Sequence, residues 1–334
     1  MPTIYDIAKH AGVSAGTVSR ALSRPEKVLP ETRARIERAV ATLGYVPNAA
    51  ARTLKTQRTG KILVTVPDIA NPFFAQILQG AEDAAQAAGY AVLLGDTQQQ
   101  PAREERYAQM LRRNEADGLI VLGHRLPPTA RQIVKQLGAA APVVNGCEFD
   151  PALGIPSVHI DNAAAARAAM EHLYALGHAR IAVVGGPPDN PLHQQRLQGV
   201  RAAAKARGRV RQLRLVPGDF SVESGHAAAS AWLGTDDAPT AAFCFSDQSA
   251  LGVLAACRER GLRVPRDLSV VGFDDLASSR YLTPPLTTVA QPMREIGVRA
   301  VQLLLDILAA ADVPLQQTLT FELMLRGSTA APRA

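Results

Sequence analysis

The spacing of apolar residues near the start of the chain predicts two short helices. Apolar side chains recur at helical intervals over residues 4–11 and again over residues 18–22. Thr3 and Ser14 are suited to cap the two helix N-termini, and Gly12 ends the first helix. Two helices joined by a turn that contains glycine form the helix-turn-helix pattern, whose second helix enters the major groove of DNA.

The same pattern continues into a third helix and a weaker fourth. Apolar positions and terminal signals predict a helix from Pro30 to Leu43, ended by Gly44. Residues 48–54 favour a further short helix, which is too short to be stable alone. We therefore expect residues 47–60 to be a hinge and linker, in which the hinge helix orders only when something holds it.

From residue 61 onward, strand-like and helix-like patterns alternate. Strands are expected at residues 62–66, 90–94, 118–122, 142–145, 158–160, 181–184, 213–216, 242–245, 268–272, 287–291 and 318–325. Helices are expected at residues 72–88, 102–113, 128–137, 163–175, 192–207, 222–233, 249–260 and 294–308. This alternation predicts parallel sheets with helices on both faces. Some eleven strands are too many for one compact sheet of this kind, so two lobes are expected.

The expected domain organisation follows from these patterns. Residues 1–46 form an all-α headpiece, and residues 61–334 form an α/β core. The last segments return to both lobes and create crossings that act as a hinge. The expected boundaries place residues 61–160 and 290–317 in lobe one, and residues 161–289 and 318–330 in lobe two.

Charge is distributed unevenly between these parts. Residues 1–60 hold ten basic and four acidic side chains, a surplus of six positive charges that equals the formal charge of +6 of the whole chain. The remaining residues are neutral overall. A basic module joined to a neutral one indicates that the headpiece binds a polyanion while the core has another task.

Other features limit the function classes. Three cysteines without paired spacing are typical of reduced cytosolic thiols, and no apolar run reaches the ~18 residues of a membrane span. No signal peptide is expected, because a helix begins within three residues of the first methionine. The predicted protein is cytoplasmic, has no membrane partner, and needs no cofactor or metal.

Enzymatic motifs are weak in this sequence. Residues 12–16 match the GxSxG nucleophile motif, but that motif needs a preceding strand, and here a helix precedes it. Residues 185–188 lack the Gly-Lys-Ser/Thr ending of a phosphate loop. No cluster of nucleophile, base or metal ligands is apparent, so we do not expect an enzyme.

Candidate ligand-binding residues lie at the ends of predicted core strands. The segment from Asp68 through Asn71 to Phe73 and Phe74 follows the first core strand, a usual place for ligand contacts in α/β proteins. Adjacent phenylalanines cannot face the same way on a helix, so one is expected to pack inward and the other to project into a cleft; the alternative is that both are core residues.

Two charged residues suit a diol. Arg196 lies near the start of a helix that follows a strand, and Asp274 ends another strand. An arginine fork and a carboxylate that face each other across a cleft would bind vicinal hydroxyl groups. Surface charge is the alternative for both. His124 and Glu148 end further strands and are weaker candidates.

The whole chain resembles the LacI/GalR family of repressors. The resemblance is carried by the runs DIAKHAGVSAGTVSRAL and GYVPNAAARTL in the headpiece. It implies a core with the two-lobed, type I periplasmic-binding-protein fold and a ligand between the lobes. It also implies a set of DNA-binding residues: Thr3, Ser14, Ala15, Gly16, Thr17, Ser19, Arg20, Asn48, Ala51 and Leu54.

Within that set, the resemblance places Ala15, Gly16 and Arg20 at base-reading positions and Leu54 at the residue that dimers wedge into the minor groove. Relatives often carry larger polar residues where this chain has Ala15 and Gly16. We therefore expect little direct readout there, so that Arg20, DNA shape and phosphate contacts specify the operator.

The resemblance also extends the ligand site. It implies effector contacts from Arg196, Asp274, Phe220, Ser246 and Asp247, although Ser246 replaces an asparagine common in the family. Runs such as VPDIANPFF and FCFSDQSALG are most similar to a nucleoside-responsive member. The implied effector is a nucleoside such as cytidine, with its base stacked on Phe73 or Phe220.

The expected function is a transcriptional repressor whose operator affinity is controlled by a small molecule. It would bind pseudo-palindromic double-stranded DNA as a homodimer. A free pentose or hexose is the alternative effector, and a solute-binding protein is a less favoured alternative that would need an export signal. The residues leave open whether the effector induces or corepresses, whether dimers pair into tetramers, and whether a co-regulator protein takes part.

Overall fold

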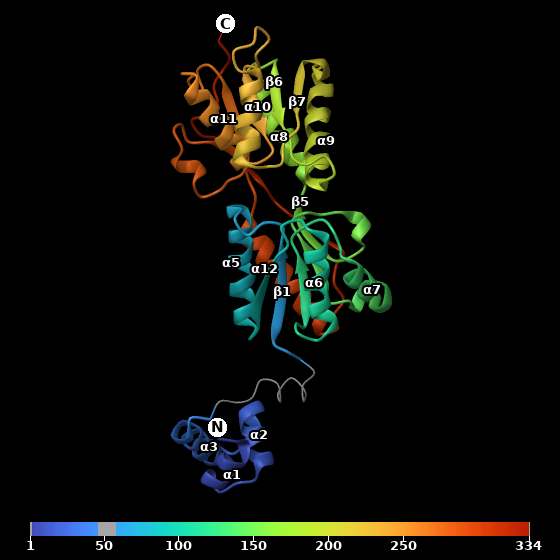
Figure 1. Cartoon of the computed structure of the whole chain (residues 1–334), viewed down its shortest axis with the longest axis vertical. Helices are drawn as coiled ribbons and strands as arrows, with labels where there is room; N and C mark the ends of the chain where they lie inside the picture. The colour runs from blue at the N-terminus through green and yellow to red at the C-terminus, as the bar shows by residue number, and fades with distance from the viewer. Residues whose placement is uncertain (1, 46–57, 334) are drawn as a thin grey trace. The chain divides into compact units, whose positions relative to one another are not determined.

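The computed structural model describes residues 2–45 and 58–333 and divides the chain into two compact units, Met1–Thr59 and Gly60–Ala334 (Figure 1). The first unit contains the helical headpiece and the second contains the α/β core. The expected hinge helix at residues 48–54 lies outside the described residues.

The headpiece is built as its apolar spacing predicts. Its described helices are α1 (Ile4–Ala11), α2 (Ala15–Ser23), the short 3-10 helix η1 (Pro25–Lys27) and α3 (Pro30–Leu43). Ile7, Val18 and Ile36 meet in its core with at most 1% of their surface exposed. Gly12 ends α1 with a positive φ of 63°. Leu22, which the apolar stripe placed inside, is instead 39% exposed because it lies at the edge of α2.

The core contains two six-stranded sheets within the described residues. Sheet one comprises β1 (Lys61–Val66), β2 (Ala91–Asp96), β3 (Gly118–Val121), β4 (Val143–Gly146), β5 (Ser157–Ile160) and β11 (Gln316–Leu319). Sheet two comprises β6 (Ile181–Val184), β7 (Leu213–Val216), β8 (Ala241–Cys244), β9 (Ser269–Asp274), β10 (Thr287–Ala290) and β12 (Glu322–Met324).

The two sheets repeat one topology. Sheet one has the order β11-β5-β4-β3-β1-β2, and sheet two has the order β12-β10-β9-β8-β6-β7. All neighbours are parallel except β12, which runs antiparallel to β10. The carboxyl ends of the parallel strands of each lobe therefore lie at one edge of its sheet, where α/β proteins bind ligands.

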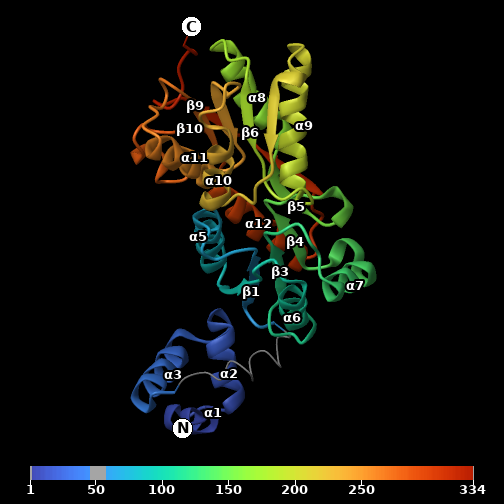
Figure 2. The same cartoon turned by 45° about the horizontal axis from the view of Figure 1, so that its top comes forward.

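Helices cover both faces of each sheet. Lobe one carries α5 (Pro72–Ala87), α6 (Pro101–Arg112), α7 (Pro128–Leu137) and α12 (Met293–Leu308). Lobe two carries α8 (Asn162–Ala175), α9 (Pro191–Ala206), α10 (Val222–Trp232) and α11 (Asp247–Glu259). Short 3-10 helices are η2 (Gly138–Ala140), η3 (Pro151–Leu153), η4 (Val210–Gln212) and η5 (Ser279–Tyr281). In Figure 2, β6 lies between α9 on one side and α10 and α11 on the other.

Alternation along the central strands supplies a core on each face. In β1, Ile62 and Val64 pack beneath α5 and α12, whereas Leu63 packs beneath α6 and α7. All three side chains are at most 1% exposed. A strand buried on both faces explains why this segment is a continuous apolar run in the sequence. No helix among the described residues is both long and apolar enough to span a bilayer.

Helices α5 and α12 lie side by side although more than two hundred residues separate them in sequence (Figure 1). A Cβ atom on Gly80 would lie 2.0 Å from the backbone oxygen of Arg294, and one on Gly297 would lie 2.0 Å from that of Ile77. The absence of side chains at both glycines therefore lets the two helix backbones touch.

The described chain passes between the lobes after β5, after β10 and between β11 and β12. The expectation of one strand over residues 318–325 is wrong, because β11 pairs with β5 in lobe one and β12 pairs with β10 in lobe two. Residues between Leu319 and Glu322 make the crossing. An apolar pattern cannot reveal this division, since it does not specify which sheet each half joins.

Candidate functional site

The exposed face of α2 presents a small set of polar groups. Ser14 caps the helix by accepting a hydrogen bond from the backbone N–H of Thr17 at 3.1 Å. Gly16 and Arg20 are exposed, and one terminal nitrogen of Arg20 lies 3.9 Å from the position that a Cβ would take on Gly16. Val18 faces the opposite way, into the core. Ser14, Gly16 and Arg20 therefore share one solvent-facing surface.

The other expected DNA-binding residues surround this surface or lie outside the described chain. Thr3 forms a capping box with Asp6, whose carboxylate accepts hydrogen bonds of 2.7 Å from the Thr3 backbone N–H and hydroxyl. Ala15, Thr17 and Ser19 are half-buried on α2. Asn48, Ala51 and Leu54 are outside the described residues.

A cleft lies where the strand carboxyl ends of the two lobes meet. In this conformation it has a cavity volume of about 40 Å³, less than the usual range of small-molecule sites. Lobe one supplies Asn71, Phe73, Phe74 and Glu148, and lobe two supplies Leu192, Arg196, Phe220, Ser246 and Asp274. Sequence positions up to about two hundred residues apart thus converge on one cavity.

Arg196 is held rigidly on the lobe-two wall. Its Nε donates to the side-chain oxygen of Asn162 at 2.9 Å, and one terminal nitrogen donates to the carbonyl of Phe245. The guanidinium carbon lies 3.6 Å from the centroid of the Phe273 ring, a close cation–π contact. Nη2 has no hydrogen-bond partner among the described residues, which leaves it available to a ligand.

Asp274 ends β9 beside this arginine. Gln291 donates a hydrogen bond of 2.8 Å to its Oδ1. Burial raises the pKa of Asp274 to about 8, an effect that the nearby positive charge of Arg196 opposes. No ion pair within 4 Å joins Arg196 and Asp274 among the described contacts, so a ligand hydroxyl pair can lie between donor and acceptor.

Aromatic rings form much of the remaining wall. Phe73 and Phe74 meet edge to face, with ring centroids 5.2 Å apart, and both are buried yet line the cleft. We expected one ring to pack inward and the other to face the cleft; instead, each of the two rings is buried and also lines the cleft. Phe220 enters from lobe two, where its ring packs against the backbone of Gly186.

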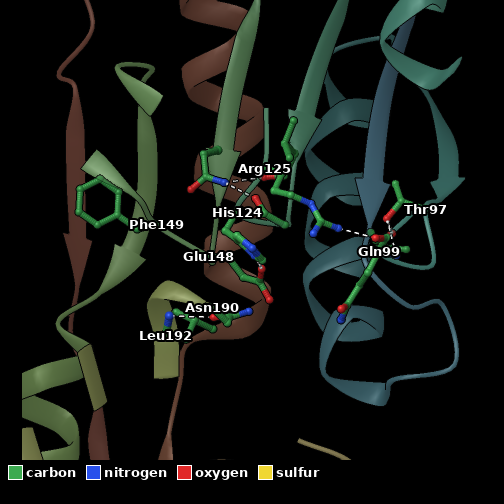
Figure 3. Close-up of polar contacts among 12 residues, drawn as sticks. Thr97, Gln99, His124, Arg125, Glu148, Phe149, Asn190 and Leu192 are labelled. Atoms are coloured by element: carbon green, nitrogen blue, oxygen red, sulfur yellow. Dashed lines mark hydrogen bonds and ion pairs between the residues drawn. The ribbon is translucent and has the colours of Figure 1, made fainter. Parts of the chain in front are cut away.

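Glu148 connects the cleft with a smaller neighbouring cavity. Its Oε2 lies 2.9 Å from Nδ1 of His124, and this hydrogen bond raises the pKa of the histidine (Figure 3). His124 itself lines the smaller cavity with Gln99 and Arg125 rather than the main cleft. The pair therefore places a carboxylate, positioned by an imidazole, at the lobe-one wall.

Three expected ligand contacts do not reach the cleft wall. Asp68 is exposed and accepts a hydrogen bond of 2.8 Å from the backbone of Ala70. His124 forms a hydrogen bond with Glu148 and lines the smaller cavity instead of the cleft. Asp247 is buried within lobe two, where its two oxygens accept hydrogen bonds from Leu276, Ser279 and Thr288. These bonds tie the start of α11 to the segments that follow β9 and to β10.

The structure adds residues that the sequence analysis omitted from the site. Leu192 lines the cleft four residues before Arg196, so the two share one face of α9; that helical spacing is a signal in the sequence. Asn162 and Gln291 orient Arg196 and Asp274. No local pattern identifies these two, because each lies in the chain next to a crossing between the lobes.

Hydrogen bonds also join the lobes beside the cleft. Gln248 at the start of α11 donates to Oδ1 of Asn71 at 3.0 Å, and Gln195 of α9 donates to the carbonyl of Phe149 at 3.1 Å. Asn71 simultaneously caps α5 by accepting from the backbone N–H of Phe73. The two walls are thus in direct contact in this conformation.

Comparisons with known proteins agree with both parts of the chain. A profile described as bacterial regulatory proteins, lacI family, matches residues 3–48, and one described as a periplasmic binding protein-like domain matches residues 170–329. The HTH-type transcriptional repressor CytR of Escherichia coli (strain K12) is 42% identical over 331 residues, covering 98% of this chain and 96% of that protein.

The solved structures that resemble this chain include LacI-family regulators. The lac repressor dimer bound to operator and the anti-inducer ONPF has a TM-score of 0.89 at 30% identity, covering 99% of both chains. A LacI family transcriptional regulator from Enterococcus faecium with bound ribose has a TM-score of 0.74 at 28% identity, covering 82% of this chain and all of that one. These relatives are transcriptional regulators rather than enzymes. The chain belongs to the LacI family of bacterial DNA-binding transcriptional regulators.

Proposed function

We propose that this LacI-family repressor binds a pseudo-palindromic operator as a homodimer, and that a nucleoside such as cytidine binds in the cleft and induces release from DNA. Helix α2 would read the major groove through Arg20, and residues 48–54 would form the hinge helices that carry Leu54. Because its target is DNA, we place the protein in the cytoplasm.

The observation that carries the nucleoside proposal is that the cleft has a polar wall on lobe two and a largely aromatic wall on lobe one. Lobe two offers the Arg196 donor and the Asp274 acceptor, which suit the vicinal hydroxyls of a ribose. Lobe one offers the rings of Phe73 and Phe74 and the Glu148 carboxylate, which suit a planar base with polar edges.

A free sugar is the second candidate effector. The regulator from Enterococcus faecium supports it, since that protein was solved with bound ribose. Arg196 and Asp274 would serve a pentose equally well. The aromatic rings of lobe one favour the nucleoside, because a pentose has no planar ring to stack on them.

Dimer formation is supported by apolar side chains left on the surface of lobe two. Leu251 of α11 is 39% exposed, and Tyr281 of η5 is 81% exposed. Apolar side chains exposed on adjacent segments favour association with another protein surface, and η5 and α11 are adjacent because Ser279 donates a hydrogen bond to Asp247. A two-fold dimer would present two headpieces to two half-sites, which is why the operator is expected to be pseudo-palindromic.

Thermal unfolding of the full-length protein with cytidine, ribose or neither tests the effector. Cytidine should raise the melting temperature more than ribose at equal concentration, because it adds contacts on the lobe-one wall. Stabilisation by ribose alone would favour the sugar candidate.

Operator binding is tested next. A duplex selected from a random pool should bind the protein in preference to competitor DNA, and sedimentation should show a dimer. Cytidine should weaken this binding by roughly 5- to 150-fold, the range of a coupling energy of ~1 to 3 kcal/mol. Failure to select any duplex, with or without ligand, would overturn the proposed function.

A further inference from the structure

Glu148 stands between two cavities and uses only one of its carboxylate oxygens. Oε2 accepts a hydrogen bond from His124 Nδ1 at 2.9 Å on the side of the smaller cavity (Figure 3). An ionised carboxylate only accepts, so the histidine is the donor. Oε1 has no hydrogen-bond partner in the part of the chain that the structure describes, and Glu148 also lines the main cleft. One acceptor atom is therefore left for a ligand.

The surroundings hold this acceptor in place. The Glu148 side chain is 8% exposed. On the far side of the histidine, Arg125 forms a 3.0 Å ion pair with Glu104 and donates to the carbonyl of Gln99 (Figure 3). When a ligand fills the cleft and displaces water from this nearly buried carboxylate, the ligand must supply a donor in its place.

The position of Glu148 relative to Arg196 and Asp274 indicates which part of a bound nucleoside supplies the hydrogen-bond donor. Arg196 and Asp274 lie on lobe two and suit ribose hydroxyls, whereas Glu148 lies on lobe one beside Phe73 and Phe74. A nucleoside with its ribose on lobe two places its base against the phenylalanine rings. The edge of that base then faces the Glu148 carboxylate, which accepts hydrogen bonds and repels carbonyl oxygens.

We propose that Glu148 selects nucleosides whose base carries an exocyclic amino group over those with a carbonyl at the same position. Cytosine donates from its amino group, and uracil presents an oxygen there. This inference rests on the proposed nucleoside effector and adds to it the residue that determines base specificity. His124 is a positioning residue, because it touches Oε2 and not the cleft.

Isothermal titration of the full-length protein with cytidine, uridine and N4,N4-dimethylcytidine tests the inference. Cytidine should bind at least about tenfold more tightly than either analogue, because neither analogue satisfies the buried carboxylate. In Glu148→Gln the side-chain oxygen can still accept from His124 while the amide nitrogen donates, so the ratio of cytidine to uridine affinity should fall to within about threefold. Glu259→Gln is the matched control, because Glu259 makes a similar 2.8 Å pair with His226 on exposed helices.

The outcomes separate this inference from the proposed function. Equal binding of cytidine and uridine, or a ratio that is the same in Glu148→Gln and the unmodified protein, would overturn the role of Glu148 and leave a nucleoside effector in place. Binding of ribose without binding of any nucleoside would overturn both. A changed ratio in Glu259→Gln would show that the effect does not come from the cleft.

Discussion

Asp274 is the carboxyl group proposed to accept hydrogen bonds from the effector. It lies at the end of β9, almost fully buried, with Gln291 as a donor. Arg196 lies beside it on the same lobe, whereas from the sequence we expected the two to face each other across the cleft. Burial raises its pKa to about 8, so the acid is largely protonated at neutral pH in the free protein. Ligand hydroxyls that donate to the carboxylate favour its ionised form.

We predict that effector affinity rises with pH. A bound diol lowers the pKa of Asp274 below its free value of about 8, so binding releases a proton. Affinity should therefore increase from about pH 6 and level off above about pH 8. Titration calorimetry in buffers of different ionisation heat measures the released proton. Asp274→Asn should bind more weakly and without this pH dependence; a flat profile in the unmodified protein would contradict the assignment.

On the exposed face of α2, the proposed base-reading residue is Arg20, the one charged side chain of that helix. Arg20→Ala should cost ~1 to 3 kcal/mol at the selected operator and reduce discrimination between base pairs, because a bidentate base contact is lost. Fluorescence anisotropy with operator and scrambled duplexes measures both effects.

Arg33→Ala is the matched control for Arg20. Arg33 is an exposed arginine of α3 that pairs with Glu37 at 2.7 Å. Its loss should weaken operator and scrambled binding alike. Equal effects of the two substitutions on selectivity would remove Arg20 from base readout.

Single residues were predictable where their role is local. Thr3, Ser14 and Gly12 cap helices as their types indicate. Arg196, expected near a helix start, and Asp274, expected at a strand end, both line the cleft. Roles that depend on partners far away in sequence were not predictable. Asp247 is adjacent to the cleft-lining Ser246, yet its hydrogen bonds to Leu276, Ser279 and Thr288 place it inside lobe two.

At the scale of elements, the contact of α5 with α12 holds lobe one together around its sheet. The helices approach at Gly80 and Gly297, where neighbouring backbone oxygens occupy the space of a side chain. The N-terminus of α5 carries Asn71, Phe73 and Phe74 to the cleft. The packing of this helix pair therefore fixes the lobe-one wall.

Gly80→Ala should destabilise the core by ~1 to 3 kcal/mol or more, because the added methyl group would overlap the backbone of Arg294. Urea unfolding measures the change. Gln79→Ala, at an exposed position of the same helix, should stay within about 0.5 kcal/mol of the unmodified protein. Similar stability of the two variants would show that α5 and α12 are not in backbone contact.

The same scale shows why elements were easier to predict than their pairing. Periodicity identified the strands and helices of the core within a few residues of their ends, since each depends on local alternation. The division of residues 316–324 into β11 and β12 was missed, because pairing with β5 in one lobe and β10 in the other is decided far away in sequence. The Gln248 bond to Asn71 between lobes had no sequence signal for the same reason.

For the whole molecule, the charge separation predicts two different responses to salt. Residues 1–60 carry the entire surplus of six positive charges, and the core is neutral. Operator affinity should therefore fall steeply with salt, by about 10³ to 10⁵ between 50 and 200 mM for 6 to 10 phosphate contacts. Cytidine affinity should change little over this range, since cytidine is uncharged. Anisotropy and calorimetry across a salt series measure the two slopes; a flat operator slope would contradict a basic DNA-binding headpiece.

The passage of the chain from lobe one to lobe two and back has a consequence for biosynthesis. When a ribosome has translated the first three hundred residues, the described helices of the headpiece are already made, but each sheet still lacks its final edge strand, because β11 and β12 are the last strands to be made. The effector-binding core can therefore be completed only near the end of translation, after the headpiece. A nascent chain cut short near residue 310 would carry the helices of the headpiece but not the finished effector-binding core.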